Sequence, residues 1–130
     1  MSGIYAGSSP KFLTRIRDEN GVQLDPEDIN QIIEVKIWIY NAISGTVVAK
    51  FYLNTAPTPL GTWRQAEVKT IGPSDKRILL TLLPAETLAA PVNKNEIQVT
   101  VTVPDADFDS GEREIIKKGR FADINPAKSS

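Results

Sequence analysis

Hydrophobic and polar residues alternate most clearly in two stretches of the chain. In residues 33–40 the apolar positions are Ile33, Val35, Ile37 and Ile39. In residues 97–103 they are Ile97, Val99, Val101 and Val103. Successive side chains of a strand point to opposite faces, so this period of two predicts strands that bury one face in the core.

Shorter apolar stretches between turn signals predict the other strands. They cover residues 11–17, 47–53, part of 62–71, 77–83 and a short segment that begins at 119–121. The turn signals are Asn20-Gly21, Ser44-Gly45 and Gly72-Pro73. Turns that recur about every ten residues are typical of an antiparallel β-sandwich. We therefore expect an all-β fold of about seven to eight strands.

One or two short helical turns are expected beside the strands. Asp25-Pro26 combines a capping residue with a proline at the first helical position. Residues 84–88 offer a second turn, which would connect one sheet to the other. The stretch 54–61 contains three residues that do not extend a central strand, Pro57, Pro59 and Gly61, and is expected to be a loop.

The chain of 130 residues has the usual size of a single domain. This domain is expected over residues 11–124, between a flexible N-terminal arm over residues 1–10 and a flexible C-terminal tail over residues 125–130. Residues 1–10 lack the basic start and the long apolar run of a secretion signal. The protein is therefore expected in a cytoplasm or in a particle assembled there.

Composition argues against catalysis and against several kinds of partner. The chain contains no cysteine and no histidine, which removes disulfides, thiolate nucleophiles and the imidazole groups used in Ser/His/Asp and Cys/His sites. A formal net charge of -1 gives no general attraction to nucleic acid or to an anionic membrane. We expect no enzymatic activity, no cofactor, no nucleic-acid partner and no membrane partner.

Two acidic clusters are candidates for chemical sites. The first consists of Asp105, Asp107 and Asp109, at alternate positions as in a calcium loop. Ser110 replaces the glycine of such a loop and Ile116 replaces its last carboxylate, so a solvated turn explains this cluster better. The second consists of Asp25 and Asp28, which helix capping explains. No catalytic or metal-ligating residue is therefore predicted.

Aromatic and basic side chains are the candidate interaction residues. Trp38 and Tyr40 lie on the polar face of their strand, and Tyr52 of the neighbouring strand is expected beside them. They would stack on sugar rings or anchor a protein partner, unless the following loop or the second sheet covers them. The basic candidates are Lys117, Lys118 and Arg120. These form either a patch for an acidic partner or a solvated edge strand.

Several short segments follow one another in an order typical of one protein family. In the first half they are Arg17-Asp18-Glu19-Asn20-Gly21, Leu24, the strand at 33–40 and the Gly-Thr-Val-Val turn at 45–48. In the second half they are the strand at 78–82, Ala85-Glu86-Thr87, the strand at 97–103 and Gly119-Arg120-Phe121. Together they resemble the small immunoglobulin-like domains of phage tail and baseplate proteins. The order departs from that family at Pro91–Asn95, where a Gly-Tyr pair is usual.

This resemblance implies an immunoglobulin-like sandwich that serves as a structural subunit of a bacteriophage particle, in a tail, neck, baseplate or capsid accessory position. The implied partners are other phage structural proteins, with copies of the chain in a homo-oligomer or a ring. The implied location is the virion, assembled in the host cytoplasm. The alternative, raised by the exposed aromatic residues, is a carbohydrate-binding or adhesion module.

Overall fold

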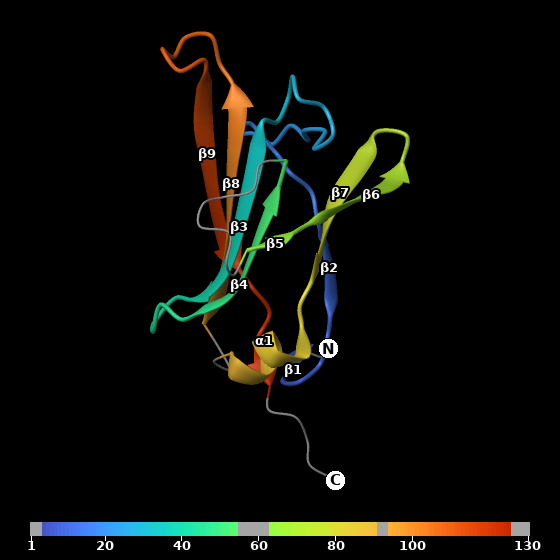
Figure 1. Ribbon diagram of the computed structural model, residues 1–130, viewed down its shortest axis with the longest axis vertical. Coiled ribbons are helices and arrows are strands. Elements are labelled where there is room, and N and C mark those ends of the chain that lie inside the picture. The colour runs from blue at the N-terminus through green and yellow to red at the C-terminus, as the bar shows by residue number, and fades with distance from the viewer. Residues whose placement is uncertain (1–3, 55–62, 91–93, 126–130) are drawn as a thin grey trace.

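The computed structural model describes residues 4–54, 63–90 and 94–125, which form two main β-sheets and one short helix (Figure 1). The five-stranded sheet has the order β5 (Arg64–Gln65), β4 (Val47–Leu53), β3 (Glu34–Asn41), β8 (Asn95–Pro104) and β9 (Glu112–Arg120). The three-stranded sheet has the order β2 (Lys11–Thr14), β7 (Asp75–Thr81) and β6 (Glu67–Gly72). The remaining elements are a parallel pair, β1 (Ile4–Tyr5) and β10 (Ile124–Asn125), and helix α1 (Pro84–Ala89). The all-β prediction is confirmed.

Strands β3 and β8 form the centre of the five-stranded sheet. They pair antiparallel, with Val35 opposite Val101 and Ile37 opposite Val99. Val35 and Ile37 are inaccessible to solvent, whereas the residues between and beside them on β3 are half-buried. The two clearest strand predictions are therefore confirmed, and β8 extends beyond residues 97–103 at both ends.

The core lies between the inner faces of the two main sheets. Ile78 and Leu80 of β7 come from the three-stranded sheet, and Phe51 of β4 comes from the five-stranded sheet together with the apolar face of β3. Each large apolar side chain that is fully buried contributes about 1.5 to 3 kcal/mol of hydrophobic stabilisation. In Figure 1 the sheets lie close together near α1 and diverge toward the opposite end, where the chain between β2 and β3 lies between them.

Seven strands of the described part have four or more residues, in agreement with the expected seven to eight. Three more, β1, β5 and β10, have two residues each. The predicted helical turn at 84–88 is confirmed as α1. At Asp25 the chain forms a turn instead of a helix, with the Asp25 carboxylate accepting a hydrogen bond from the Glu27 N–H at 2.9 Å. From residue 55 onward, the loop expected over 54–61 lies outside the described residues.

The two ends of the described chain correct the expected domain boundaries. Ile4 of β1 pairs with Ile124 of β10, and both side chains are buried. Residues 4–10 therefore belong to the packed domain, so the prediction of a flexible arm is wrong for them, and β10 includes the first residue of the expected tail. Two residues are too few to show a period, which is why these strands could not be predicted. Residues 1–3 and 126–130 lie outside the described ranges.

Thr87 of α1 fastens the N-terminal segment to the domain. Its side chain is fully buried, and its Oγ1 accepts a hydrogen bond from the Gly7 N–H at 2.9 Å and donates one to the Ser8 carbonyl at 2.7 Å. The helix that carries it starts at Pro84, and the Glu86 carboxylate accepts a hydrogen bond from the N–H that precedes this proline. The N-terminal cap of α1 thus positions Thr87, which holds residues 4–10 against the domain.

Replacing Thr87 with Val should lower the free energy of unfolding by about 1 to 2 kcal/mol, because Val keeps the shape of Thr but removes the hydrogen bonds of its hydroxyl. Urea denaturation followed by circular dichroism measures the change. Thr70→Val, at an exposed position of β6, is the control and should alter stability by less than about 0.5 kcal/mol. Equal effects of the two substitutions would contradict the role given to Thr87.

Candidate functional site

The three aromatic candidates lie on the outer face of the five-stranded sheet. Trp38 and Tyr40 project from β3 and Tyr52 from β4, at the positions that alternate with the buried residues of these strands. Each of the three is half-buried. The second main sheet packs on the other face and does not cover them. The structure therefore brings all three onto one surface.

A fourth aromatic residue, Trp63, belongs to this surface. Its ring packs edge to face against Trp38, with ring centres 5.0 Å apart and an interplanar angle of 75°. The Lys50 ammonium lies 5.1 Å from the centre of the Trp63 ring. Trp63 lies in the stretch 62–71, where the sequence predicts a strand, but periodicity cannot show that its ring packs against Trp38 on the outer face of β3.

Tyr40 is held by the neighbouring strand. Its hydroxyl donates a hydrogen bond to the Glu96 carboxylate at 2.8 Å. This hydrogen bond is the main reason that the pKa of Tyr40 is raised above its ordinary value. Arg120 lies opposite Glu96 in the antiparallel register of β8 and β9. An aromatic, an acidic and a basic residue therefore form one row across three strands.

The basic candidates do not form a single patch. Lys118 and Arg120 lie on the outer face of β9, whereas Lys117, which pairs with Val99, lies on the inner face. The Lys117 ammonium donates a hydrogen bond to the carbonyl oxygen of Asp18. Because alternation along a strand separates sequence neighbours, only Lys118 and Arg120 share a face with the aromatic residues.

A groove opens between the end of β2 and the paired strands β8 and β9. It has a volume of about 270 Å³ and is lined by Thr14, Arg15, Ile16, Arg17, Ile97, Val99, Val101, Lys117 and Gly119. Ile97 and Val99 are only half-buried, although the residues opposite them on β3 are inaccessible to solvent. The cause is that three strands cover a sheet of five. This opening is termed the edge groove.

Among the described residues that line the edge groove, three are cations and none is a carboxylate. Arg15 forms an ion pair outside the groove with Asp75, with Nε and Oδ1 3.4 Å apart. Arg17 is exposed, and a β-bridge with Gln23 fixes its backbone. An apolar floor with a positive rim favours a ligand that combines an apolar group with negative charge.

The turn that follows Arg17 is tied to β9. Arg113 of β9 donates to the Glu19 carboxylate, with Nη2 and Oε1 2.9 Å apart, and its Nε lies 2.7 Å from Oδ2 of Asp105. The hydrogen bond from Arg113 lowers the pKa of Glu19, so this pair stays charged at neutral pH. These contacts hold the rim of the edge groove at a fixed position against β9.

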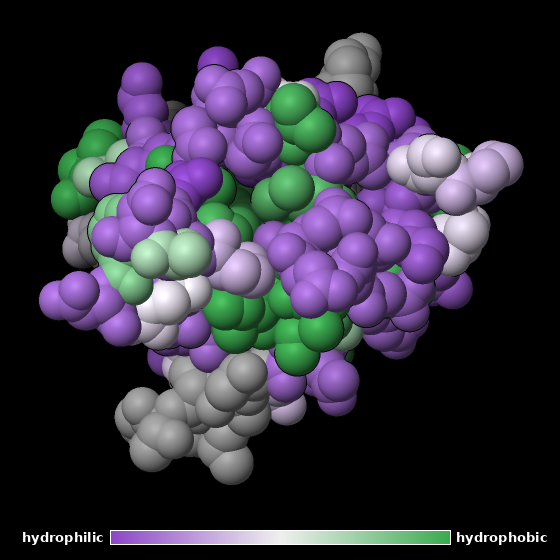
Figure 2. Space-filling view, turned by 90° about the horizontal axis from the view of Figure 1, so that it is seen from above, coloured by the Kyte–Doolittle hydropathy of each residue, from purple (hydrophilic) through white to green (hydrophobic). Residues whose placement is uncertain are grey.

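Exposed apolar side chains also gather at one end of the molecule. Figure 2 looks onto the end that carries the β8–β9 loop and shows hydrophobic residues in its middle, surrounded by hydrophilic ones. The large exposed hydrophobic residues of the β2–β3 connection, the end of β6 and the β8–β9 loop are Val22, Ile29, Ile71 and Phe108. A hydrophobic centre with a polar rim is typical of protein interfaces.

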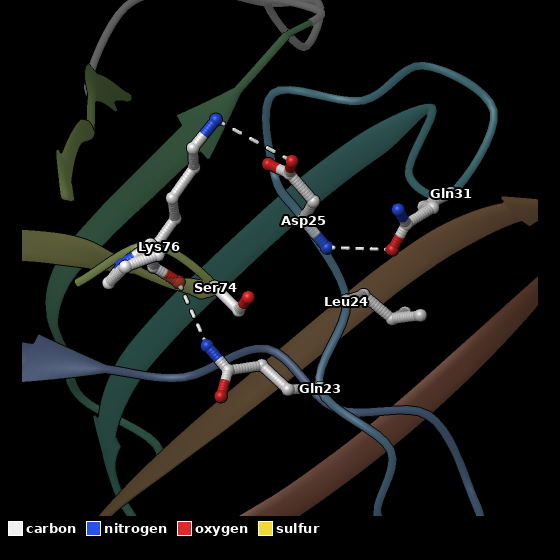
Figure 3. A pocket seen from close by; sticks show the side chains of 7 residues that line it. Gln23, Leu24, Asp25, Gln31, Ser74 and Lys76 are labelled. Atoms are coloured by element: carbon white, nitrogen blue, oxygen red, sulfur yellow. Dashed lines mark hydrogen bonds and ion pairs between the residues drawn. The ribbon is translucent and has the colours of Figure 1, made fainter. Parts of the chain in front are cut away.

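A second cleft, of about 290 Å³, is polar and lies between residues 23–31 and the β6–β7 turn (Figure 3). The Lys76 ammonium lies 3.5 Å from Oδ2 of Asp25 and 3.1 Å from Oε1 of Glu27. Gln31 Oε1 accepts a hydrogen bond from the Asp25 N–H at 2.9 Å, and Gln23 donates one to the Lys76 carbonyl at 3.3 Å. The polar groups of this cleft therefore bind one another.

Two charged groups at this polar cleft have pKa values shifted away from neutral pH: Lys76, which lines the cleft, and Asp28, which accepts a hydrogen bond from Gln31 beside it. The hydrogen bond with Glu27 raises the pKa of Lys76, and the hydrogen bond from the Asn30 N–H lowers the pKa of Asp28. A general acid or base works best with a pKa near the operating pH. Both shifts lead away from that value, so the cluster is best explained as an ion-pair network that fixes the surrounding turns.

The acidic loop between β8 and β9 is shaped by its own hydrogen bonds. Asp105 Oδ1 accepts a hydrogen bond from the Asp107 N–H at 3.0 Å, while its other oxygen faces Arg113. Within residues 4–54, 63–90 and 94–125, no three Asp, Glu, His or Cys side chains are grouped so that they could hold a metal ion. In the same ranges, no helix is long and apolar enough to cross a membrane.

Asp75, the first residue of β7, is surrounded by donors. Arg77 Nη2 lies 2.7 Å from its carboxylate, Gln23 Nε2 lies 3.0 Å away, and Arg15 reaches it from the end of β2. The hydrogen bond from Arg77, with smaller contributions from Gln23 and Arg15, holds the pKa of Asp75 well below its ordinary value. This carboxylate therefore links the polar cleft to the rim of the edge groove.

No family model, curated protein or solved structure matches the chain. The edge groove and the aromatic outer face are therefore the features from which a function is inferred.

The pH dependence of stability should report the state of Asp75. Its folded-state pKa lies below that of the unfolded chain, about 3.9, so its contribution is present above about pH 4 and is lost as the pH falls further. Asp75→Asn should lower the melting temperature at pH 6 and reduce the additional loss between pH 6 and pH 2.5. Asp109→Asn, in the exposed β8–β9 loop, should keep the wild-type profile. Parallel profiles for wild type and Asp75→Asn would contradict the prediction.

Removing Trp63 should expose Trp38, the other tryptophan of the chain. We expect Trp63→Ala to shift the fluorescence emission of Trp38 to longer wavelength and to lower the free energy of unfolding. The edge-to-face contact alone is worth about 0.5 to 1.5 kcal/mol. Trp63→Phe keeps a ring at this position and should show smaller changes in both measurements. Identical emission from the two variants would show that Trp63 does not cover Trp38.

Proposed function

We propose that this protein is a non-enzymatic structural subunit of a bacteriophage particle, in a tail, neck, baseplate or capsid accessory position, and that it acts through protein–protein assembly. The observation that carries the proposal is the edge groove, where part of the inner face of the five-stranded sheet stays open in the single chain. Apolar surface left in water costs about 25 cal/mol per Å². Exposed apolar surface with a polar rim therefore favours binding to another protein.

The order of the strands supports an immunoglobulin-like sandwich. That fold has strands B, E and D in one sheet and C′, C, F and G in the other. Here β2, β7 and β6 follow the first order, and β4, β3, β8 and β9 follow the second. Helix α1 corresponds to the connection between E and F and contains the Ala85-Glu86-Thr87 segment of the resemblance. The proposal of a phage structural subunit depends on this resemblance.

The non-enzymatic part of the proposal is supported by the polar cleft. Its carboxylates and its lysine bind one another, and the resolved pKa shifts of Asp28 and Lys76 keep these groups charged at neutral pH. A chain without histidine or cysteine also lacks the side chains that most often act as proton carriers and nucleophiles. Binding therefore accounts for these surfaces better than catalysis does.

A carbohydrate-binding or adhesion module is the alternative function. A sugar stacks on an open aromatic face, and several coplanar rings make the best platform. Trp38 and Trp63 instead stand at 75° to one another, and Lys50 lies over Trp63. These contacts occupy ring surface on which a sugar would have to stack. They therefore argue against sugar binding and leave assembly as the better explanation.

Light scattering on the purified protein over a concentration series tests the proposed function. We expect a defined oligomer or a mass that rises with concentration, because joining copies covers the apolar surface of the edge groove. The mass of a single chain at every concentration, up to the millimolar range, would contradict self-assembly. Quenching of tryptophan fluorescence by a glycan under the same conditions would favour the alternative.

A further inference from the structure

The residues that line the edge groove determine which kind of group it can bind. Its floor is formed by Ile97, Val99 and Val101, and its rim carries Arg15, Arg17 and Lys117. Its volume of about 270 Å³ lies near the lower limit of small-molecule pockets, roughly 300 Å³. One large side chain is a better match for this space than a free ligand. The best occupant is an apolar side chain that is flanked by carboxylates.

The β8–β9 loop of the same protein presents such a segment. Phe108 is 52% exposed and stands between Asp107 and Asp109. Neither of these two carboxylates forms an ion pair with any residue that the structure describes. Two carboxylates beside an exposed aromatic ring are complementary in charge to the cations on the rim of the edge groove. The ring itself is complementary to the apolar floor. The chain therefore carries two complementary surfaces.

The loop does not reach the groove of its own chain. Strands β8 and β9 pair without a register shift from Glu96 and Arg120 to Pro104 and Glu112. Pro104 follows Val99 by five residues, which is about 17 Å along a strand. The hairpin thus holds its loop at one end and the floor of the groove near the other. Contact between them requires two molecules.

We propose that the β8–β9 loop of one copy docks in the edge groove of a second copy. Phe108 covers Ile97 and Val99, and the carboxylates of Asp107 and Asp109 face the cations of the rim. The inference rests on the proposed function and names the interface through which that assembly occurs. Because loop and groove are different surfaces, the contact is heterologous, and its repetition gives a closed ring or an open filament.

Arg17 is the rim cation that most favours this contact. Arg15 already pairs with Asp75, and Lys117 donates to the Asp18 carbonyl, whereas the structure records for Arg17 only the backbone bridge to Gln23. A charge without an established ion pair gains the most from an incoming carboxylate. Charge reversal at this position should therefore weaken docking without removing an ion pair of the folded chain.

Two variants on opposite sides of the interface test the proposal. Phe108→Ala removes the inserted side chain, and Arg17→Glu places a negative charge on the rim. Each should weaken self-association, measured by sedimentation velocity and light scattering, by roughly 30-fold or more, the effect of losing a central interface residue. Thermal melting checks that both variants remain folded.

Mixing the two variants gives a sharper result. Phe108→Ala keeps an intact groove, and Arg17→Glu keeps an intact loop, so one functional contact forms between them. An equimolar mixture should therefore give a complex of two chains that does not grow further, although each variant alone stays monomeric. A general loss of stability or solubility does not produce this pattern.

Matched controls use exposed positions away from both surfaces. Ile43→Ala removes an apolar side chain that is 77% exposed in the β3–β4 turn, and Lys69→Glu reverses an exposed charge on β6. Both should associate like the wild type.

The possible outcomes separate this inference from the proposed function. If the wild type self-associates and each variant, Phe108→Ala or Arg17→Glu, self-associates as strongly as the wild type, the proposed interface is wrong but self-assembly stands. If the two variants alone are monomeric and their mixture also stays monomeric, loop and groove do not contact one another and the inference is overturned. If the wild type is a single chain at all concentrations, both the inference and the self-assembly proposed above fail.

Discussion

The register between β3 and β8 is the constraint on which the rest of the structure depends. Val35 opposite Val101 and Ile37 opposite Val99 place the apolar side chains of both strands on one face. A shift by one residue would move them to the other face and bring Trp38 to the inside. The covering sheet, the aromatic outer face and the edge groove all follow from this single choice of face.

Much of the fold was predictable because alternation is a local property. The strands β3 and β8, the all-β class and the helical turn at α1 each depend on residues that are close together in the sequence. The pairing of β1 with β10 was not predictable, because two residues carry no period and their partners lie at the other end of the chain. Contacts over such distances leave no pattern in a single sequence.

The candidate site was predictable only in part. Trp38, Tyr40 and Tyr52 share a face, as strand alternation requires, and the same rule separates Lys117 from Lys118. Trp63 was missed, because its contact with Trp38 joins two positions that are far apart in the sequence. The edge groove was also missed. It results from the unequal number of strands in the two sheets, which is a property of the whole topology.

The parallel pair of β1 and β10 has a consequence for the order in which the domain folds. Every strand of the two main sheets lies between Ile4 and Ile124 in the sequence. Closing so long a loop costs more conformational entropy than forming the hairpins inside it. We therefore expect β1 and β10 to pair after the main sheets have formed. Until then the unpaired β1 offers a backbone edge with which the same segment of a neighbouring chain can pair.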